Sequence, residues 1–468
     1  MVTNQIQNIF NKQKANGLSV AKSGVAERIG RLKRLQKFLL DHIAEACEAT
    51  KNDFGKPEVE TIVGELLVLQ NELSHAIKNL GRWMSPQKQS TSLVAIGTSS
   101  YIQHEAKGCA LIISPWNYPI NLAIKPLISA VAAGCTAIIK PSEMTPNSSA
   151  FVRKIVEHVF EPDEVAVVEG DAEVASQLLS LPFNHIFFTG SPAVGKIVMK
   201  AAAEHLASVT LELGGKSPSI VDVTADISAT ARSIAWGKFF NNGQTCIAPD
   251  YILVHESVHD AFVSEMKTVV NEMYNEAGNG IQNSLDYARI VNHNHFRRLT
   301  DLLSDAIEHG ALVQFGNQNS EDQRFIAPTL LTNVDDSMRV MKEEIFGPIL
   351  PVKKFASIQD AVAHINSGEK PLALYIHSTS RKNADYILRN TSAGNALVNE
   401  VLTQFGNPEI PFGGVNNSGI GKSNGFYGFQ EFSNPKGVMK RRFGTMRFLY
   451  PPYSPRLVAI LNKVLKYV

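Results

Sequence analysis

The run HIFFTGSPAVGK, residues 185–196, decides the fold class of this chain. Its strand-forming residues lead directly into a glycine-containing turn, and the residues after the turn open a helix. At such a strand-to-helix turn, backbone N–H groups and the helix dipole can hold a pyrophosphate. The run therefore predicts an α/β sheet that binds a nucleotide.

The sequence on either side extends the same alternation of strands and helices. Between residues 108 and 217, segments of helix length separate the short β-rich runs CALIIS, TAIIK, EVAVVEG and SVTLELGG. This order is typical of a parallel sheet with crossover helices. A second α/β stretch follows over residues 216–412, the first eighty or so residues have helical periodicity, and residues 90–105 predict a protruding strand pair.

The turn at residues 190–196 nearly matches two phosphate-binding motifs and completes neither. Gly190 and Lys196 have the spacing of a P-loop, but Ile197 follows where Mg²⁺ coordination requires Ser or Thr. A kinase or ATPase is therefore disfavoured. The G-x-G-x-x-G fingerprint is also absent, so the turn needs support from other segments.

Composition restricts the class of protein further. The chain has 468 residues, 45 Lys and Arg against 44 Asp and Glu, and four cysteines without C-x-x-C spacing. These values predict a soluble, cytoplasmic protein of two or three domains, with free thiols, no metal site and no nucleic-acid partner. The N-terminus lacks the apolar run of a secretory signal, and we expect no membrane-spanning helix.

Cys246 is the strongest candidate for a reactive group. It lies in the run FNNGQTCIAPD, residues 240–250, whose small polar residues would leave its thiol accessible. Most cysteines are inert core residues, and Cys47, Cys109 and Cys135 match that description because they lie in periodic apolar stretches. We interpret Cys246 as a nucleophile.

Three further segments place polar residues at strand ends, where ligands of open α/β sheets bind. After TAIIK, Lys140 and Glu143 supply a cation and a carboxylate that suit a ribose. Glu212 in LELGGK is a candidate base beside glycines that let a ligand approach the backbone. Asn117 lies between the two prolines of PWNYP, which would hold its amide rigidly as an oxyanion donor.

Together these segments resemble the aldehyde dehydrogenase superfamily. Its motifs occur here in the family's order: PWNYP, KPSE, FTGSPAVG, LELGGKSP, GQTC, EEIFGP and PFGGVNNSGIG. The short N-terminus, Tyr118 and the YPPYSP tail are most similar to the class 3 branch, which acts on fatty and aromatic aldehydes. The resemblance implies an α/β fold with a Rossmann-type NAD(P)-binding domain, an α/β catalytic domain and a small β oligomerisation arm.

The resemblance also implies domain bounds and an oligomeric state. The short class 3-like form indicates a homodimer joined through the arm. The implied parts are the NAD(P)-binding domain (1–87 and 107–213), the catalytic domain (214–415), the arm and bridging region (88–106 and 416–445) and a basic amphipathic tail (446–468).

The mechanism that the resemblance implies uses the three candidates above. Cys246 would attack an aldehyde, Asn117 and the Cys246 backbone N–H would stabilise the thiohemiacetal oxyanion, and Glu212 would activate water to hydrolyse the thioester. NAD is favoured because Glu143 should repel a 2′-phosphate, but class 3 includes enzymes that also use NADP. Further family positions are the adenosine ribose (Lys140, Glu143), the pyrophosphate (Gly190, Ser191, Gly195), the nicotinamide ribose (Glu344, Phe346) and the substrate pocket (Tyr118).

The C-terminal segment carries a charge of its own. From Lys436 onward there are eight basic residues and no acidic one. In residues 456–468, the apolar side chains form one helical stripe opposite Asn462, Lys463 and Lys466. This segment is far too short to span a bilayer. The segment could lie on an anionic membrane, cap the substrate funnel as in the fatty-aldehyde branch, or pack against protein. The stripe is Leu457, Ile460, Leu461, Val464 and Val468.

Two rival functions remain open on sequence alone. In a CoA-acylating dehydrogenase, CoA rather than water would open the thioester, and a base such as Glu212 argues against it. A non-catalytic binding or structural protein could keep the same fold, although the joint presence of Cys246, Glu212 and Asn117 argues against that. A cysteine protease is disfavoured because no histidine motif accompanies Cys246.

Overall fold

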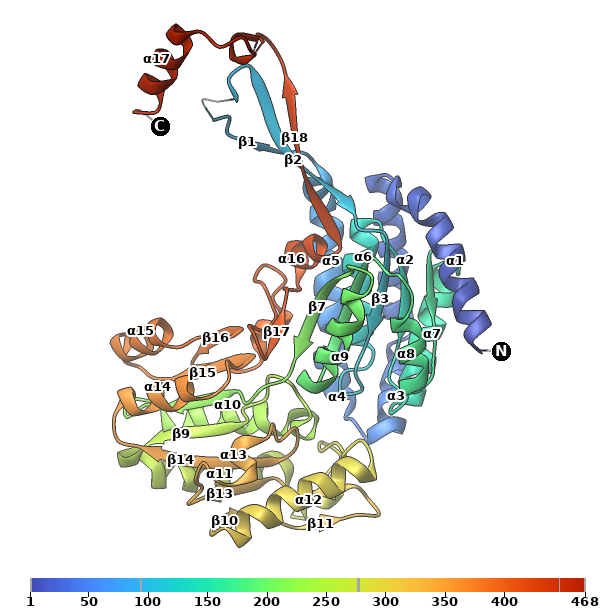
Figure 1. The fold of residues 1–468 in the computed structure, drawn as a ribbon. Helices are drawn as coiled ribbons and strands as arrows, with labels where there is room; N and C mark the ends of the chain where they lie inside the picture. The colour runs from blue at the N-terminus through green and yellow to red at the C-terminus, as the bar shows by residue number, and fades with distance from the viewer. Residues whose placement is uncertain (1, 93–94, 276–277, 446, 467–468) are drawn as a thin grey trace.

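The body of the protein contains two open, largely parallel sheets flanked by helices, and a long arm projects from it (Figure 1). The computed structural model describes residues 2–92, 95–275, 278–445 and 447–466. The predicted α/β fold class is confirmed, and the predicted domain division stays a prediction.

The first sheet has the strand order β17-β7-β6-β3-β4-β5. Its five parallel strands are the β-rich runs that the sequence predicted, each bounded by turn residues. The added strand β17 runs antiparallel to β7. The bounds are β3 (Cys109–Ile113), β4 (Thr136–Lys140), β5 (Val165–Val167), β6 (His185–Gly190), β7 (Ser208–Leu213) and β17 (Gly419–Ile420).

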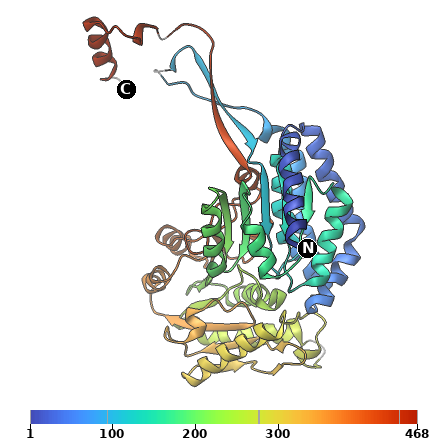
Figure 2. The same cartoon turned by 45° about the vertical axis from the view of Figure 1, so that its right-hand side comes forward.

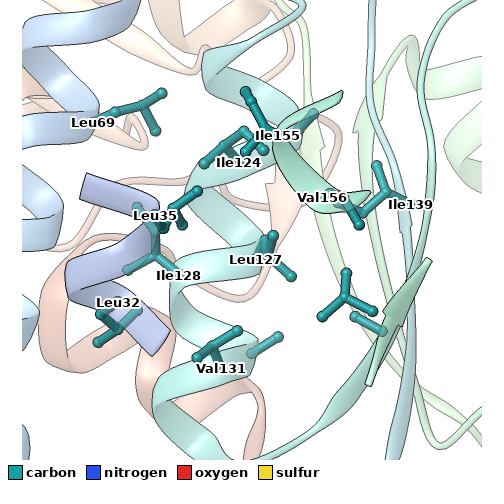
Figure 3. Close-up of a cluster of buried hydrophobic side chains, with 14 of the residues drawn as sticks. Leu32, Leu35, Leu69, Ile124, Leu127, Ile128, Val131, Ile139, Ile155 and Val156 are labelled. Atoms are coloured by element: carbon teal, nitrogen blue, oxygen red, sulfur yellow. The ribbon is translucent and has the colours of Figure 1, made fainter. Parts of the chain in front are cut away.

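Alternate residues of the central strands pack into two different cores, so helices cover both faces of this sheet. On β3, Ala110 and Ile112 join one buried cluster, whereas Cys109, Leu111 and Ile113 join the other. The first cluster includes side chains from α2, α5, α6 and α7 (Figure 3). The second includes side chains from α1, α8 and α9. This two-sided burial explains why the strands are continuously apolar.

The predicted helical periodicity of the first eighty residues is confirmed. The N-terminal helices are α1 (Val2–Ala21), α2 (Val25–Asp41), α3 (Ile43–Phe54), α4 (Glu58–Thr61), a π-helical turn (Ile62–Leu66) and α5 (Leu67–Met84). Between the strands of the first sheet run α6 (Asn121–Ala133), α7 (Pro146–Val159), α8 (Ala172–Leu179) and α9 (Pro192–Ala203).

The second sheet has the order β10-β13-β14-β9-β8-β15-β16 and is parallel except for β10 at one edge. Its strands are β8 (Pro218–Val221), β9 (Tyr251–His255), β10 (Leu312–Phe315), β13 (Thr329–Thr332), β14 (Ile349–Phe355), β15 (Ala373–His377) and β16 (Asn395–Val398). Its helices are α10 (Ile227–Phe239), α11 (His259–Tyr274), α12 (His293–Glu308), α13 (Arg339–Lys342), α14 (Ile358–Ser367) and α15 (Arg381–Asn390). A small ribbon pairs β11 (Asn319–Ser320) with β12 (Phe325–Ile326).

The arm is a three-stranded antiparallel sheet of β1 (Gln87–Gln89), β2 (Thr98–Ala106) and β18 (Ser433–Arg441). The predicted strand pair at 90–105 is thus shifted, because β1 ends at Gln89 and residues 90–97 connect the strands; residues 93–94 lie outside the described residues. The segment before β18, including α16 (Gly425–Glu431), packs against the first sheet's helices.

The C-terminal tail forms α17 (Pro455–Val464) at the far end of the arm, away from both sheets (Figures 1 and 2). Of the predicted apolar stripe, Ile460, Leu461 and Val464 are exposed and Leu457 is half-buried, whereas Val468 lies outside the described residues. Within the described part of the chain, no helix is long and apolar enough to cross a membrane.

Candidate active site

A cavity of about 690 Å³ lies where the two halves of the body meet. The carboxyl ends of β6 and β7 reach it from the first sheet, and the segments preceding β9 and β15 reach it from the second. All three predicted catalytic residues, Cys246, Glu212 and Asn117, line it. The structure therefore brings together residues that are up to 129 positions apart in the sequence.

Cys246 lies in a loop with an unusual backbone. Residues 241–243, which follow α10, all have left-handed conformations, with φ of 54°, 56° and 71°. Gly243 is required because a Cβ there would lie 2.4 Å from the carbonyl oxygen of Gly347. Cys246 is partly exposed, whereas the other three cysteines are buried as predicted.

The surroundings of the Cys246 thiol favour its protonated form. Burial raises its pKa well above the ordinary range, and the nearby carboxylates of Glu212 and Glu344 raise it further. A thiolate at this position therefore needs a base to accept its proton. The sequence alone could not show this, because the two carboxylates are distant from Cys246 in the chain.

Asn117 is buried in the turn between β3 and α6, beside the loop that carries Cys246. The side-chain Nδ2 of Asn117 donates to the backbone carbonyl oxygen of Gln244 at 3.0 Å. The backbone carbonyl oxygen of Asn117 accepts from Asn241 Nδ2 at 2.9 Å. An amide nitrogen has two hydrogens, so one N–H remains for a group in the cavity. These bonds fix the Asn117 amide relative to Cys246.

Glu212 is the penultimate residue of β7, and both of its carboxylate oxygens are hydrogen-bonded. Thr189 Oγ1 donates to Oε2 at 3.3 Å, and the hydroxyl of Ser423 donates to Oε1. Burial raises the pKa of Glu212, and the hydrogen bond from Ser423 and the positive charge of Lys125 oppose that rise. A carboxylate with a raised pKa is suited to accept a proton near neutral pH.

Tyr118 lies in the cavity wall, but its hydroxyl is engaged by the protein. It hydrogen-bonds Thr245 Oγ1 at 2.7 Å, and the Lys56 ammonium lies 4.1 Å from the centre of its ring. The ring presents an apolar surface to the cavity, while the hydroxyl holds the residue next to Cys246.

The residues predicted to hold the cofactor fall into two groups. Gly190, Ser191, Glu344 and Phe346 line the cavity. Lys140, Glu143 and Gly195 lie outside its lining, although Lys140 and Gly190 each end a strand of the first sheet. The Lys140 ammonium pairs with Glu143 at 2.6 Å.

The backbone around β6 and β7 is shaped for a dinucleotide. Ser191 caps α9, whose first N–H groups point to the carboxyl edge of the sheet, where a pyrophosphate binds. A Cβ on Gly195 would lie 2.7 Å from Leu213, so this glycine lets α9 pack tightly on β7. A Cβ on Gly214 would lie 2.0 Å from the Glu344 carboxylate. The residues present therefore fit NAD(P).

Glu344 and Phe346 are held at the opposite wall of the cavity. Burial raises the pKa of Glu344 to about 8, and neighbouring Asp250 contributes to the rise. Phe346 has a φ of 51° and packs edge-on against Trp116, with ring centres 5.3 Å apart. Both residues come from the loop before β14.

Sequence reasoning missed a set of buried and half-buried polar residues around the predicted catalytic groups. Lys56 and Glu65 form a fully buried ion pair at 2.8 Å, and Glu65 also accepts backbone N–H bonds at the start of α6. In the sequence, the only indication of this ion pair was the presence of charged residues among the apolar ones of residues 56–65. The other missed residues are Glu60, Lys125, Thr189, His295, Arg298 and Ser423.

No metal centre accompanies these groups in the described residues. Across those ranges, no three His, Cys, Asp or Glu side chains are arranged to hold a metal ion.

Comparisons with known proteins agree with this geometry. The model of the aldehyde dehydrogenase family matches residues 3–438. The 4,4'-diaponeurosporen-aldehyde dehydrogenase of Staphylococcus aureus is 43% identical over 430 residues, which cover 92% of this chain and 91% of that protein. Aldehyde dehydrogenase family 3 member B3 of the mouse is 40% identical over 438 residues, which cover 93% and 90%.

A solved structure matches over nearly the whole length of both chains. The substrate-bound state of Staphylococcus aureus AldH superposes with a TM-score of 0.92 at 41% identity, covering 98% of this chain and 99% of that one. The chain belongs to the aldehyde dehydrogenase family, with class 3 members among its relatives. It is an oxidoreductase that oxidises aldehydes to carboxylic acids with NAD or NADP.

Proposed function

We propose that this enzyme oxidises medium- or long-chain aliphatic or aromatic aldehydes through a thiohemiacetal and a thioester on Cys246. The observation that carries the proposal is the convergence of Cys246, Glu212 and Asn117 on one cavity. The walls of that cavity are mainly apolar and aromatic, which suits an apolar aldehyde. Prominent wall residues are Trp236, Phe240, Leu402, Phe405 and Phe412.

The first step is attack of Cys246 sulfur on the aldehyde carbon. Because the pKa of the thiol is raised, the attack requires transfer of its proton to a base, and of the two carboxylates that line the cavity, Glu212 and Glu344, we assign this role to Glu212. The carbonyl oxygen gains negative charge, which the free N–H of Asn117 and the backbone N–H of Cys246 stabilise.

The cofactor residues orient the next step. Lys140 and Glu143 would hold the adenosine ribose, the turn at Gly190 and Ser191 the pyrophosphate, and Glu344 and Phe346 the nicotinamide ribose. When bound, the nicotinamide supplies the acceptor for the hydride that leaves the substrate carbon. NAD is the preferred cofactor, because the carboxylate of Glu143 accepts bonds from a ribose 2′-hydroxyl and repels a 2′-phosphate.

Glu212 completes the cycle by hydrolysis of the thioester. After Glu212 has released the thiol proton to solvent, its carboxylate takes a proton from water, the water oxygen bonds to the thioester carbon, and the carbon–sulfur bond breaks. The carboxylic acid leaves, and Cys246 recovers its proton from Glu212.

The arm and the tail support proposals on assembly and location. The projecting sheet of β1, β2 and β18 would join two subunits into a homodimer in the cytoplasm. On α17, Val458 and Ile460 are 52% and 51% exposed next to basic residues, and Leu465, directly after the helix, is 74% exposed, which favours peripheral contact with an anionic membrane.

The central test measures NAD reduction across a panel of aldehydes. Wild-type protein should reduce NAD with apolar aldehydes, and Cys246→Ala should lose this activity entirely because the covalent route needs the sulfur. Cys109→Ala is the matched control, since its thiol is buried in the core. Substantial turnover by Cys246→Ala would contradict the covalent mechanism. Acyl-CoA formation on adding CoA would favour the CoA-acylating alternative.

A further inference from the structure

Ser423 and Thr189 donate hydrogen bonds to the Glu212 carboxylate from the two sides of strand β7. β7 lies between β6 and β17 in the first sheet. Thr189 is the direct register partner of Glu212 on β6, and Ser423 follows β17. Each hydroxyl donates to a different carboxylate oxygen.

The Ser423 hydroxyl has a second acceptor within reach. The carbonyl oxygen of Phe412 lies 3.4 Å from Ser423 Oγ, because the backbones of these two residues form an isolated antiparallel bridge. A hydroxyl carries one hydrogen and two lone pairs, so Ser423 donates to one acceptor at a time and can accept a bond as well.

We propose that Ser423 is a positioning residue that lets buried Glu212 take up and release a proton without leaving a polar atom unpaired. The inference rests on the proposed role of Glu212 as base. When Glu212 is ionised, the Ser423 hydroxyl donates to Oε1. When Glu212 has accepted a proton from water, its own O–H donates to Ser423 Oγ, and the Ser423 hydrogen turns to the Phe412 carbonyl oxygen.

Other charged and titratable groups around Glu212 act differently. Lys125 of α6 donates to the Phe405 carbonyl oxygen at 3.3 Å, and Lys422 donates to the carbonyl oxygens of Gly413 and Gly414. Both ammonium groups favour the ionised carboxylate from a distance, and the Cys246 thiol faces it across the cavity. Ser423 is bonded to the carboxylate itself and can reverse the direction of that bond.

The test compares Ser423→Thr with Ser423→Val, which have nearly the same shape and differ in the hydroxyl. Hydrolysis of p-nitrophenyl acetate needs no nicotinamide and separates acylation of Cys246, seen as a burst, from deacylation, seen as the steady state. Ser423→Val should slow the steady state about tenfold, because a hydrogen bond to a charged group is lost.

The pH profile distinguishes positioning from a structural role. Loss of the donor disfavours the ionised carboxylate, so the acid limb of the steady-state rate of Ser423→Val should move to higher pH by about one unit. Ser423→Thr should keep both the wild-type limb and the wild-type burst. If Ser423→Val does not fold, Ser423→Ala takes its place under the same criterion.

Ser418→Ala provides a control from the same loop. Its hydroxyl is buried too, but it bonds the backbone of Val415, so its removal should leave the acid limb unmoved. Equal acid limbs in the variants with and without the Ser423 hydroxyl would overturn the inference. A wild-type protein with neither burst nor aldehyde-dependent NAD reduction would instead contradict the proposed function.

Discussion

At the scale of single residues, the loop that carries Cys246 (residues 241–246) is held by segments from elsewhere in the molecule. The left-handed asparagines at 241 and 242 each cost about 1–3 kcal/mol of backbone strain. Glu60 accepts the backbone N–H of Asn241 at 2.8 Å, and the carbonyl oxygen of Ala288 accepts Asn242 Nδ2 at 2.6 Å. These bonds offset the strain and fix the loop that carries Cys246.

Replacing Asn117 tests the oxyanion role at this scale. Asn117→Ala should lower kcat by about 10²–10³-fold with a small change in KM, because the amide stabilises charge that develops only during the reaction. Stopped-flow NADH formation with a saturating aldehyde measures it. Asn71→Ala removes another asparagine of the cavity wall and should stay near wild type. A kcat of Asn117→Ala within threefold of wild type would contradict the role.

Sequence reasoning predicted the residues proposed to react but few of the residues that hold them. Cys246, Asn117 and Glu212 lie in motifs whose composition signals exposed, turn-bound chemistry. Ser423 has no such signal, because its relation to Glu212 arises only when β17 pairs with β7. The pKa of Cys246 was likewise beyond sequence reasoning, since it depends on burial and on two remote carboxylates.

At the scale of elements, the π-helical turn is tied to the turn after β3 by one buried ion pair. Glu65 of the π-helical turn binds Lys56 and the backbone N–H groups of Ile120 and Asn121. Lys56 also reaches the Asn117 carbonyl oxygen at 3.5 Å. The pair thus joins the N-terminal helices to the residue proposed to stabilise the oxyanion.

Breaking this pair should be costly to the fold. Lys56→Met leaves the Glu65 carboxylate buried without its cation, so unfolding in urea should require about 3–5 kcal/mol less than in wild type. Lys37→Met removes the exposed pair with Asp41 and should change stability by less than about 0.5 kcal/mol. Comparable midpoints for the two variants would show that the buried pair is dispensable.

The elements themselves were predictable to different degrees. Short apolar runs bounded by glycine and proline identified β3, β4, β6 and β7, because strands buried on both faces need continuous apolar sequence. The two-residue strand β17 and the π-helical turn have no periodicity to detect. β1 was misplaced because its three residues are polar and exposed or half-exposed.

At the scale of the whole molecule, the arm and tail stand apart from the catalytic body (Figure 2). The arm sheet is complete without the tail, since β18 ends at Arg441. The proposed dimer contact and the proposed membrane contact are therefore separable in one chain.

Removing the residues after Pro455 tests that separation. The truncated protein should stay a dimer in sedimentation equilibrium and keep turnover of a short aldehyde, but should lose binding to anionic liposomes, because α17 supplies the apolar and basic surface. Lys463→Glu should weaken liposome binding partially. Unchanged liposome binding and unchanged chain-length preference after truncation would leave the tail with a packing role alone.

The pairing of Glu212 with Ser423 also bears on how the protein is made. The two residues are 211 positions apart, so a ribosome working at about 5–20 residues per second needs roughly 10–40 seconds between them. During that interval the emerging chain carries all five parallel strands of the first sheet, but β7 is an open edge whose Glu212 carboxylate has the Thr189 hydrogen bond and lacks that of Ser423. Strand β17, which is made late in synthesis, thus pairs with the open edge of β7. A product terminated before β17 would expose this edge to chaperones and proteases.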